Sequence, residues 1–274
     1  MVKSPATTSR TKATSAPKDA LESDRQSVTS LARGLEILNC FRGGKLDLSG
    51  SELAAMTGLP QPTVWRLCHT MMELGFLLPS SGDRMRPSLL LLKLGQVALA
   101  GKPLVAKSYD AIQDLARKCR GAVGLAAWNG SRMVLVQQGL SEGQIPMDLQ
   151  VGSRFKLATS AHGWGFLAGL GESEREVLLS QFAVADPQWP KVEATFISEM
   201  KLYALRGYVL SIGSWHQGFN TVAAPILAPN GKPAFVLSCT GAAVTHDVNL
   251  LQTAVAPELL KLTSLFQLDL KQEM

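Results

Sequence analysis

The chain has 274 residues, of which 46% are hydrophobic and 18% are charged. This composition excludes a mostly disordered chain, and the length suits one large or two medium domains. The formal net charge of +5 is compatible with a polyanionic partner, but it is too small to demonstrate one.

Residues 1–27 are rich in Ser, Thr, Ala and Lys and lack the apolar core of a signal peptide, so a disordered tail is expected. No apolar run is long enough to cross a bilayer, which argues against a membrane partner. The cysteines show neither a CxxC motif nor metal-ligand spacing, so we expect no metal and no cofactor. All four are interpreted as buried thiols of a reducing, cytoplasmic compartment: Cys40, Cys68, Cys119 and Cys239.

A first helix is predicted over residues 28–41, because apolar residues recur there at helical spacing and two glycines follow. Its apolar face is expected to pack on the helices that come next. That face consists of Leu31, Leu35, Leu38 and Phe41.

Residues 48–87 carry the signals of a helix-turn-helix followed by a wing. Ser49 and Glu52 fit a capping box, so a helix is predicted to begin at Gly50. The run Thr57-Gly58-Leu59-Pro60 then ends this helix, because glycine permits the positive φ of a helix exit and proline cannot continue it.

A second helix is predicted from about Gln61 to Leu74. One stripe of it is apolar, comprising Val64, Leu67, Cys68, Met71 and Leu74. The N-terminal half of the opposite side carries Gln, Thr, Trp, Arg and His, which is typical of a recognition helix that reaches base edges in the DNA major groove. Arg66 suits a guanine or a phosphate, and Gln61 suits an adenine.

A wing is predicted after this helix, with a short strand at residues 76–78 and a turn at residues 79–83. Arg84 and Arg86 follow the turn, where they can face phosphates, although ordinary surface charges remain the alternative. Arg33 of the first helix can reach the backbone as well. The candidate DNA-binding residues are Arg33, Ser49, Gln61, Pro62, Thr63, Trp65, Arg66, His69, Arg84 and Arg86.

A helical connector is predicted over residues 88–103, with Gly101-Lys102-Pro103 at its end. It separates a winged helix-turn-helix domain at residues 28–87 from a second domain at residues 104–274. That second domain begins with a helix to about Cys119, and hairpins then alternate with helices, which favours an α+β domain on an antiparallel sheet. Strands are predicted at residues 122–128, 132–138, 147–157, 208–212, 221–227 and 234–240, and helices at 160–170, 173–182, 197–206 and 249–266.

Residues 28–266 resemble the IclR-type bacterial transcriptional regulators. The matching motifs are SLARGLEIL at 30–38, TGLPQPTVWRL at 57–67, LLKLG at 91–95, VGSRFKL at 151–157, RGY at 206–208 and VAAPI at 222–226. The resemblance implies a winged helix-turn-helix domain, a linker helix and a GAF-like effector domain. It also implies homodimers that pair into tetramers (dimers of dimers) on double-stranded operator DNA.

The resemblance further implies that Thr63 and Arg66 face DNA. Pro62 and Trp65 depart from the residues that are common at these positions in the family. Trp65 can stack on a sugar or pack on a thymine methyl, so the base preference of relatives does not transfer to this chain.

In such regulators a small effector binds inside the C-terminal domain, within segments that match 153–165, 209–222 and 235–241. The implied effector residues are Arg154, Ser160, Ala161, His162, Gly163, Trp215, Asn220, Thr221, Ser238 and Thr240. The start of the helix at Ser160 can present backbone N–H groups to a carboxylate, or Ser160 can be a plain N-cap. Arg154 can equally pair with an anion or lie on the surface, and Trp215 can line the pocket or a subunit contact.

Relatives often carry acidic residues around 211–216, which this chain lacks. The missing acids favour an anionic effector, and we expect an aromatic or short aliphatic carboxylate. Two rival interpretations remain. An enzyme is disfavoured because no catalytic motif is present, so no catalytic residue is assigned. A winged helix that binds protein is the other alternative.

Overall fold

The computed structural model describes residues 28–42, 45–142, 149–214 and 217–272. The predicted tail at residues 1–27 lies outside them, as does Trp215. The chain divides into two compact units, one up to Gly95 and one from Gln96 on. Within the described residues, no helix is long and apolar enough to span a membrane.

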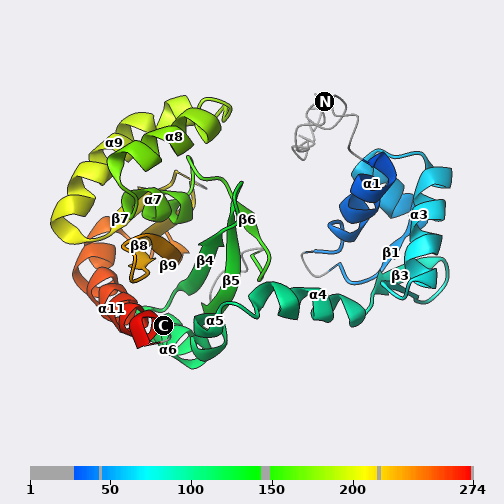
Figure 1. The fold of residues 1–274 in the computed structure, drawn as a ribbon, viewed down its shortest axis with the longest axis horizontal. Coiled ribbons are helices and arrows are strands. Elements are labelled where there is room, and N and C mark those ends of the chain that lie inside the picture. Colours follow the sequence, from blue (N-terminus) through cyan, green and yellow to red (C-terminus); the bar gives the residue numbers. More distant parts are fainter. Residues whose placement is uncertain (1–27, 43–44, 143–148, 215–216, 273–274) are drawn as a thin grey trace, which may run out of the picture. The chain divides into compact units, whose positions relative to one another are not determined.

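The N-terminal unit is a winged helix-turn-helix, as predicted (Figure 1). Its helices are α1 (Thr29–Leu38), α2 (Gly50–Thr57) and α3 (Gln61–Glu73), and α4 (Leu90–Leu99) begins in this unit and ends after Gly95. The strands β1 (Leu48–Ser49), β2 (Leu77–Pro79) and β3 (Arg84–Pro87) form an antiparallel sheet in the order β1-β3-β2. The hairpin of β2 and β3 is the wing.

Local signals explain why the helix-turn-helix folds here. The capping box is present, since Ser49 Oγ accepts from the Glu52 N–H and Glu52 Oε2 accepts from the Ser49 N–H. Gly58 ends α2 in the left-handed region with φ of 70°, where a side chain is disfavoured. Pro60 is the N-cap of α3, and Pro62 lies in its first turn, which suits a residue without an N–H donor. The two helices therefore begin and end where the sequence predicts.

The apolar face of α1 differs from the prediction. Ile37 is its buried residue, whereas Leu31 and Leu35 are 63% and 52% exposed. On α3, Val64, Cys68 and Met71 are buried as expected, but Leu74 is exposed. These leucines have the spacing of a helix face. Spacing alone, however, does not show whether that face is buried in the core or remains exposed in the single chain.

The C-terminal unit is built on a six-stranded antiparallel sheet in the order β6-β5-β4-β9-β8-β7. The α+β class is confirmed. The strands are β4 (Ala122–Trp128), β5 (Met133–Leu140), β6 (Arg154–Phe155), β7 (Val209–Ile212), β8 (Phe219–Leu227) and β9 (Pro233–Ala242). The expected extended segment at residues 147–157 forms only the two-residue strand β6, and part of it lies outside the described residues.

Helices cover both faces of this sheet (Figure 1). One face packs on α6 (Tyr109–Cys119) and α11 (Ala256–Gln272), and the other packs on α7 (Ala161–Ala168) and α9 (Trp189–Arg206). Two cores result, because strand residues alternate between the faces: Val222 and Leu237 join the first core, and Ala223 and Val236 join the second. The remaining helices are α5 (Pro103–Lys107), α8 (Glu172–Phe182), α10 (Val248–Leu250) and the π-helical turn η2 (Leu251–Val255).

Three helix boundaries differ from the prediction. The helix expected after Pro103 is divided into α5 and α6 at Ser108, whose hydroxyl donates to the Val105 carbonyl. Helix α9 begins at Trp189 rather than Ile197, with Pro190 in its first turn. The last helix is divided as well, because η2 interrupts it. The four cysteines are buried, as predicted.

Candidate DNA-binding surface and effector cavity

The outward side of α3 carries most of the candidate DNA-binding residues. Val64, Cys68 and Met71 are buried on the opposite side and fix the helix on the core of the N-terminal unit. Exposed side chains on the outward side are Gln61, Pro62, Trp65, Arg66 and His69, and Thr63 is half-buried. The structure therefore brings the predicted α3 residues onto one accessible surface.

Several of these side chains have partners within the N-terminal unit. Gln61 Nε2 donates to Ser51 Oγ at 2.9 Å. The rings of Trp65 and His69 stack with centroids 5.2 Å apart and planes 9° apart. His69 Nε2 also lies 3.5 Å from Glu73 Oε1. These exposed side chains therefore contact other side chains of the same unit.

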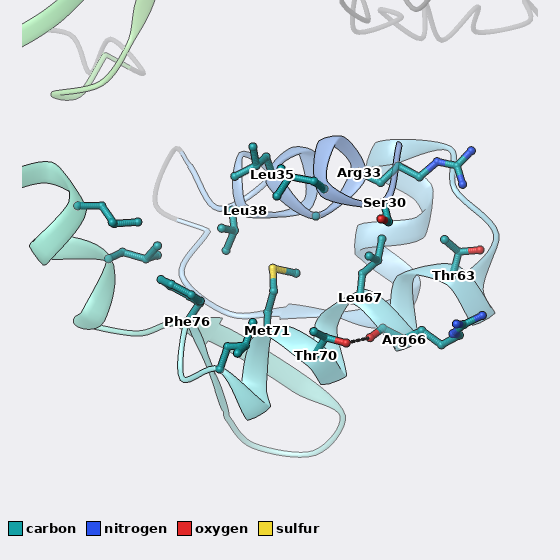
Figure 2. A pocket seen from close by; sticks show the side chains of 15 residues that line it. Ser30, Arg33, Leu35, Leu38, Thr63, Arg66, Leu67, Thr70, Met71 and Phe76 are labelled. Atoms are coloured by element: carbon teal, nitrogen blue, oxygen red, sulfur yellow. Dashed lines mark hydrogen bonds between the residues drawn. The ribbon is translucent and has the colours of Figure 1, made fainter. Parts of the chain in front are cut away.

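A groove of about 780 Å³ runs along the other flank of α3. Figure 2 shows Arg33, Thr63 and Arg66 at one end of this groove and Phe76 at the other. Between these ends the walls are mostly apolar. They include Leu31, Leu35, Leu38, Leu67, Met71, Leu74, Leu91 and Leu94. Thr70, near the middle, donates to the Arg66 carbonyl. Some of the leucines that the core leaves exposed, namely Leu31, Leu35, Leu74 and Leu94, thus line one groove.

The wing arginines have different surroundings. Arg84 Nη2 lies 2.8 Å from Glu52 Oε2 and donates to the Asp47 carbonyl at 2.9 Å, so it joins the wing to α2. The pKa of Glu52 is lowered, first by the hydrogen bond from the Ser49 N–H and further by Arg84. Arg86 is exposed. Among the described residues of the wing, Arg86 is accordingly the cation with an exposed side chain and no ion pair.

Ser49, another candidate DNA contact, is buried within the capping box. Its hydroxyl accepts from the Glu52 N–H, and its N–H donates to the Glu52 carboxylate. The backbone and the side chain of Ser49 therefore both stabilise the start of α2, so its role in this structure is helix capping.

A second cavity, of about 750 Å³, lies in the C-terminal unit beside the start of α7. It brings together two of the predicted effector residues, Arg154 and Ser160. Its described walls carry three cations and no acidic side chain. The lining residues are Arg154, Phe155, Lys156, Thr159, Ser160, Gln188, Lys191, Val192, Thr195, Ile212, Gly213, Ser214 and Gln217.

One of the three cations is already neutralised. Lys156 Nζ lies 2.8 Å from Asp186 Oδ1, and Thr159 Oγ1 donates to Asp186 Oδ2 at 3.0 Å. Burial acts to raise the pKa of Asp186, but hydrogen bonds from Lys156, the Gln188 N–H and Thr159 outweigh it and lower the pKa. Within the described residues, no hydrogen bond or ion pair engages the side chains of Arg154 or Lys191. These two carry the uncompensated positive charge of the cavity.

His162 and Ser238 form a buried layer behind the cavity wall. The ring of Phe155, which lines the cavity, stacks on His162 with centroids 4.1 Å apart. His162 Nε2 and Ser238 Oγ share a hydrogen bond of 2.8 Å. Burial lowers the pKa of His162 to about 4, so the imidazole is neutral at pH 7. These two residues support Phe155 instead of lining the cavity.

The backbone N–H groups at the start of α7 are less accessible to a ligand than the sequence predicts. Ser160 is its N-cap, and its hydroxyl accepts from the Gly163 N–H at 3.1 Å. Ala161 and Gly163 are buried, and a Cβ on Gly163 would collide with the backbone of Leu157. The Gly163 N–H is therefore already paired, and the interpretation of Ser160 as an N-cap is the one that the geometry fits.

The remaining predicted effector residues form hydrogen bonds elsewhere in the C-terminal unit. Thr221 and Thr240 face each other across β8 and β9 and share a hydrogen bond of 2.9 Å. Asn220 Nδ2 donates to the His246 carbonyl. None of the three lines the cavity.

Sequence reasoning missed Lys156, Asp186 and Lys191. Lys156 and Asp186 are thirty positions apart, so no local pattern links them. Lys191 follows the unrecognised start of α9. The Pro190 in that first turn was the available signal.

Comparisons with known proteins identify the family. Residues 30–79 match the model of the IclR helix-turn-helix domain, and residues 96–261 match the model described as bacterial transcriptional regulator IclR C-terminal. The chain is 26% identical to the HTH-type transcriptional regulator TsaQ1/TsaQ2 of Comamonas testosteroni, over 93% of each chain.

Two solved structures agree. An IclR family transcriptional regulator from Brucella abortus has 32% identity and a TM-score of 0.64, covering 91% of this chain and 95% of that one. An IclR homolog from Microbacterium hydrocarbonoxydans, complexed with 4-hydroxybenzoate, has 20% identity and a TM-score of 0.69, covering 89% of this chain and 99% of that one. At 20% identity, the similarity to the second structure shows a shared fold only. With both family models matched in order along one chain, this protein belongs to the IclR family of DNA-binding transcriptional regulators.

Proposed function

We propose that this regulator binds a pseudo-palindromic operator as a homodimer, or as a dimer of dimers, and that a small carboxylate in the effector cavity modulates this binding. Helix α3 is the element that reads bases, with Gln61, Thr63 and Arg66 toward base edges and Arg33 and Arg86 on phosphates. The observation that supports this reading is the accessible polar side of α3 opposite its buried stripe.

The apolar groove beside α3 is the proposed contact between two copies. Its exposed leucines form a continuous apolar surface of the kind that marks an interaction site. None of the described residues that line it is acidic, and Arg33 and Arg66 lie at one end. Pairing along the apolar part would leave both arginines of each copy at the margin of the interface, where DNA can reach them.

The helices around this groove have the spacing of coiled-coil seams. Val28, Leu31, Leu35 and Leu38 repeat at intervals of three, four and three residues along α1. Leu90, Leu94 and Val97 repeat at four and three along α4, a helix with no buried residue in the chain alone, and of the three Leu94 lines the groove. Such seams pack against another helix, and a second copy supplies the same helices by two-fold symmetry.

Leu35→Glu tests the dimer by sedimentation velocity across a concentration series. An unpaired carboxylate buried at the interface costs about 3–5 kcal/mol, which corresponds to a dimer weakened by more than about 100-fold. Leu205→Glu is the matched control, because Leu205 is 86% exposed on α9, outside this groove. A variant Leu35→Glu that remains as dimeric as the control would contradict this interface.

The effector proposal is carried by one observation: the described cavity walls contain three cations and no acid, and only Lys156 is paired. The volume lies within the range of small-molecule sites. An anionic group placed between Arg154 and Lys191 would satisfy both. The 4-hydroxybenzoate bound by the homolog of the same fold is an aromatic carboxylate, which supports this ligand class.

A thermal-shift panel tests the ligand class with benzoates, short aliphatic carboxylates and neutral amides of the same shape. A true ligand at 100 times its Kd stabilises by about 2.7 kcal/mol. We expect carboxylates to stabilise the protein, amides to fail, and Arg154→Ala or Lys191→Ala to abolish the effect. Lys201→Ala is the control, since Lys201 is exposed on α9 and does not line the cavity. Stabilisation by an amide alone would contradict an anionic effector.

We further propose that residues 28–87 form the DNA-binding domain, 88–103 the linker and 104–274 the effector domain. The ligand would bias the placement of paired α3 helices through the linker, with a coupling of about 1–3 kcal/mol. Operator affinity measured with and without a ligand from the panel reports this coupling. Equal affinities under saturating ligand would refute it.

A further inference from the structure

Trp65 has an exposure that neither the core nor the proposed dimer explains. Among the tryptophans that the structure describes, it alone is exposed, at 64%. It lies outside the core of the N-terminal unit and does not line the apolar groove, unlike Thr63, Arg66 and Thr70 of the same helix. Pairing of two copies through the groove would therefore leave this large apolar ring uncovered.

The ring also stacks on a neighbouring side chain. Trp65 and His69 are one helical turn apart, and their rings are nearly parallel at 5.2 Å. Glu73, a further turn along, lies 3.5 Å from His69 Nε2. The three side chains form a row along α3, and we call Trp65 and His69 the aromatic pair. A preformed flat surface loses less conformational entropy on binding than a free side chain does.

Helix α3 therefore presents two chemically different edges. The edge toward the groove carries Thr63 and Arg66, which are polar and suit hydrogen bonding. The other edge carries the aromatic pair, whose exposed ring surface is apolar. In the major groove the one apolar group that a base displays is the C5-methyl of thymine. A recognition helix that lies in this groove brings its exposed side chains to such groups.

We infer that Trp65, held flat by His69, reads a thymine in each operator half-site by packing on its C5-methyl group. This inference rests on the proposed operator binding by α3. It names Trp65 as a specificity-determining residue and His69 as a positioning residue, and the group recognised is a methyl on a base edge, not a sugar or a phosphate.

The test uses duplexes in which deoxyuridine replaces thymine, since the two differ only by that methyl. An operator is first selected by the full-length protein from random-sequence duplexes, and each thymine is then replaced in turn. Burial of one methylene-sized group is worth about 0.8 kcal/mol. We expect one position in each half-site where the replacement weakens binding about fourfold, and neutral replacements elsewhere.

Variants then attribute the effect to the aromatic pair. Trp65→Ala should bind thymine and uracil operators equally at that position, whereas Trp65→Phe should keep part of the discrimination. His69→Ala should reduce the discrimination without removing it. Circular dichroism verifies that α3 is retained, and Met56→Ala, at an exposed methionine of α2, is the matched control.

The outcomes separate the two claims. If no sequence is selected at all, operator reading by α3 is refuted, and this inference fails with it. If an operator is selected but uracil is tolerated at every position, only the methyl reading is refuted. A uracil penalty that persists undiminished in Trp65→Ala also refutes it, because another residue then contacts the methyl.

Discussion

Replacing each of the two wing arginines, Arg84 and Arg86, by alanine should have different effects, although the sequence predicts the same role for both. Arg84 forms an ion pair with Glu52 at 2.8 Å and donates to the Asp47 carbonyl at 2.9 Å. Arg86 is exposed, and within the described residues no hydrogen bond or ion pair engages its side chain. Arg84→Ala should thus act on folding, and Arg86→Ala should act on DNA binding.

The expected magnitudes follow from these contacts. The side chains of Arg84 and Glu52 are 39% and 45% exposed, and such exposed pairs contribute about 0–1 kcal/mol. The hydrogen bond to the carbonyl adds about 0.5–1.5 kcal/mol, so Arg84→Ala should lower the free energy of unfolding by about 1–2 kcal/mol. Each phosphate contact contributes about 0.9 to the slope of log K against log salt. For Arg86, a single contact corresponds to about 3.5-fold in affinity between 50 and 200 mM salt, and one contact in each subunit of a dimer corresponds to about 12-fold.

Urea unfolding and fluorescence anisotropy at several salt concentrations measure the two effects. Lys93→Ala is the control, because Lys93 is exposed on α4 and does not line the groove. The reasoning is refuted if Arg84→Ala leaves stability unchanged while the salt slope falls. An Arg86→Ala variant that keeps the slope of the unmodified protein would refute the phosphate contact.

Three further predictions concern single residues. Arg66→Ala should weaken specific operator binding by about 1–3 kcal/mol, and an unchanged footprint for this variant would argue against base reading by Arg66. Ser49→Ala removes the cap of α2 and should destabilise the protein by about 1 kcal/mol in urea unfolding; no change would mean that the capping box contributes little. The pKa of His162 is lowered to about 4, so the folded state keeps the imidazole neutral while the unfolded chain takes up a proton below about pH 6.5. Stability should therefore be full above pH 6.5 and fall between pH 6.5 and 4, and His162→Gln should flatten this dependence.

Local signals made the N-terminal unit predictable. The capping box at Ser49 and Glu52, the glycine at position 58 and the prolines at 60 and 62 each act within four residues of the helix end that they specify. The strands β4, β8 and β9 were predicted within a few residues, because hairpin turns at Asn129-Gly130 and Asn230-Gly231 bound them.

Long-range pairing was not predictable from the sequence. The sequence places Arg84 and Arg86 in equivalent positions, and only the folded chain brings Glu52 to one of them. Asp186 meets Lys156 through the packing of a loop beside α9. Helical spacing located Leu31 and Leu35 on one face of α1 but did not reveal that this face is left open.

The candidate effector cavity was likewise predictable only in part. Arg154 and Ser160 were assigned to a cavity from the resemblance, and the structure brings them together there. His162, Ser238, Thr221 and Thr240 come from matching segments, but alternation along the strands and the closed start of α7 turn them to buried hydrogen bonds. Which side chains line the cavity therefore depends on packing that a motif does not specify.

The most direct test of operator reading by α3 is genomic footprinting of the purified protein on the DNA of its host, at physiological salt. The account predicts a few discrete protected sites with two-fold symmetry beside one operon, and weaker protection of these sites with Arg66→Ala. Diffuse protection that disappears as salt is raised, with no preferred sequence, would contradict it.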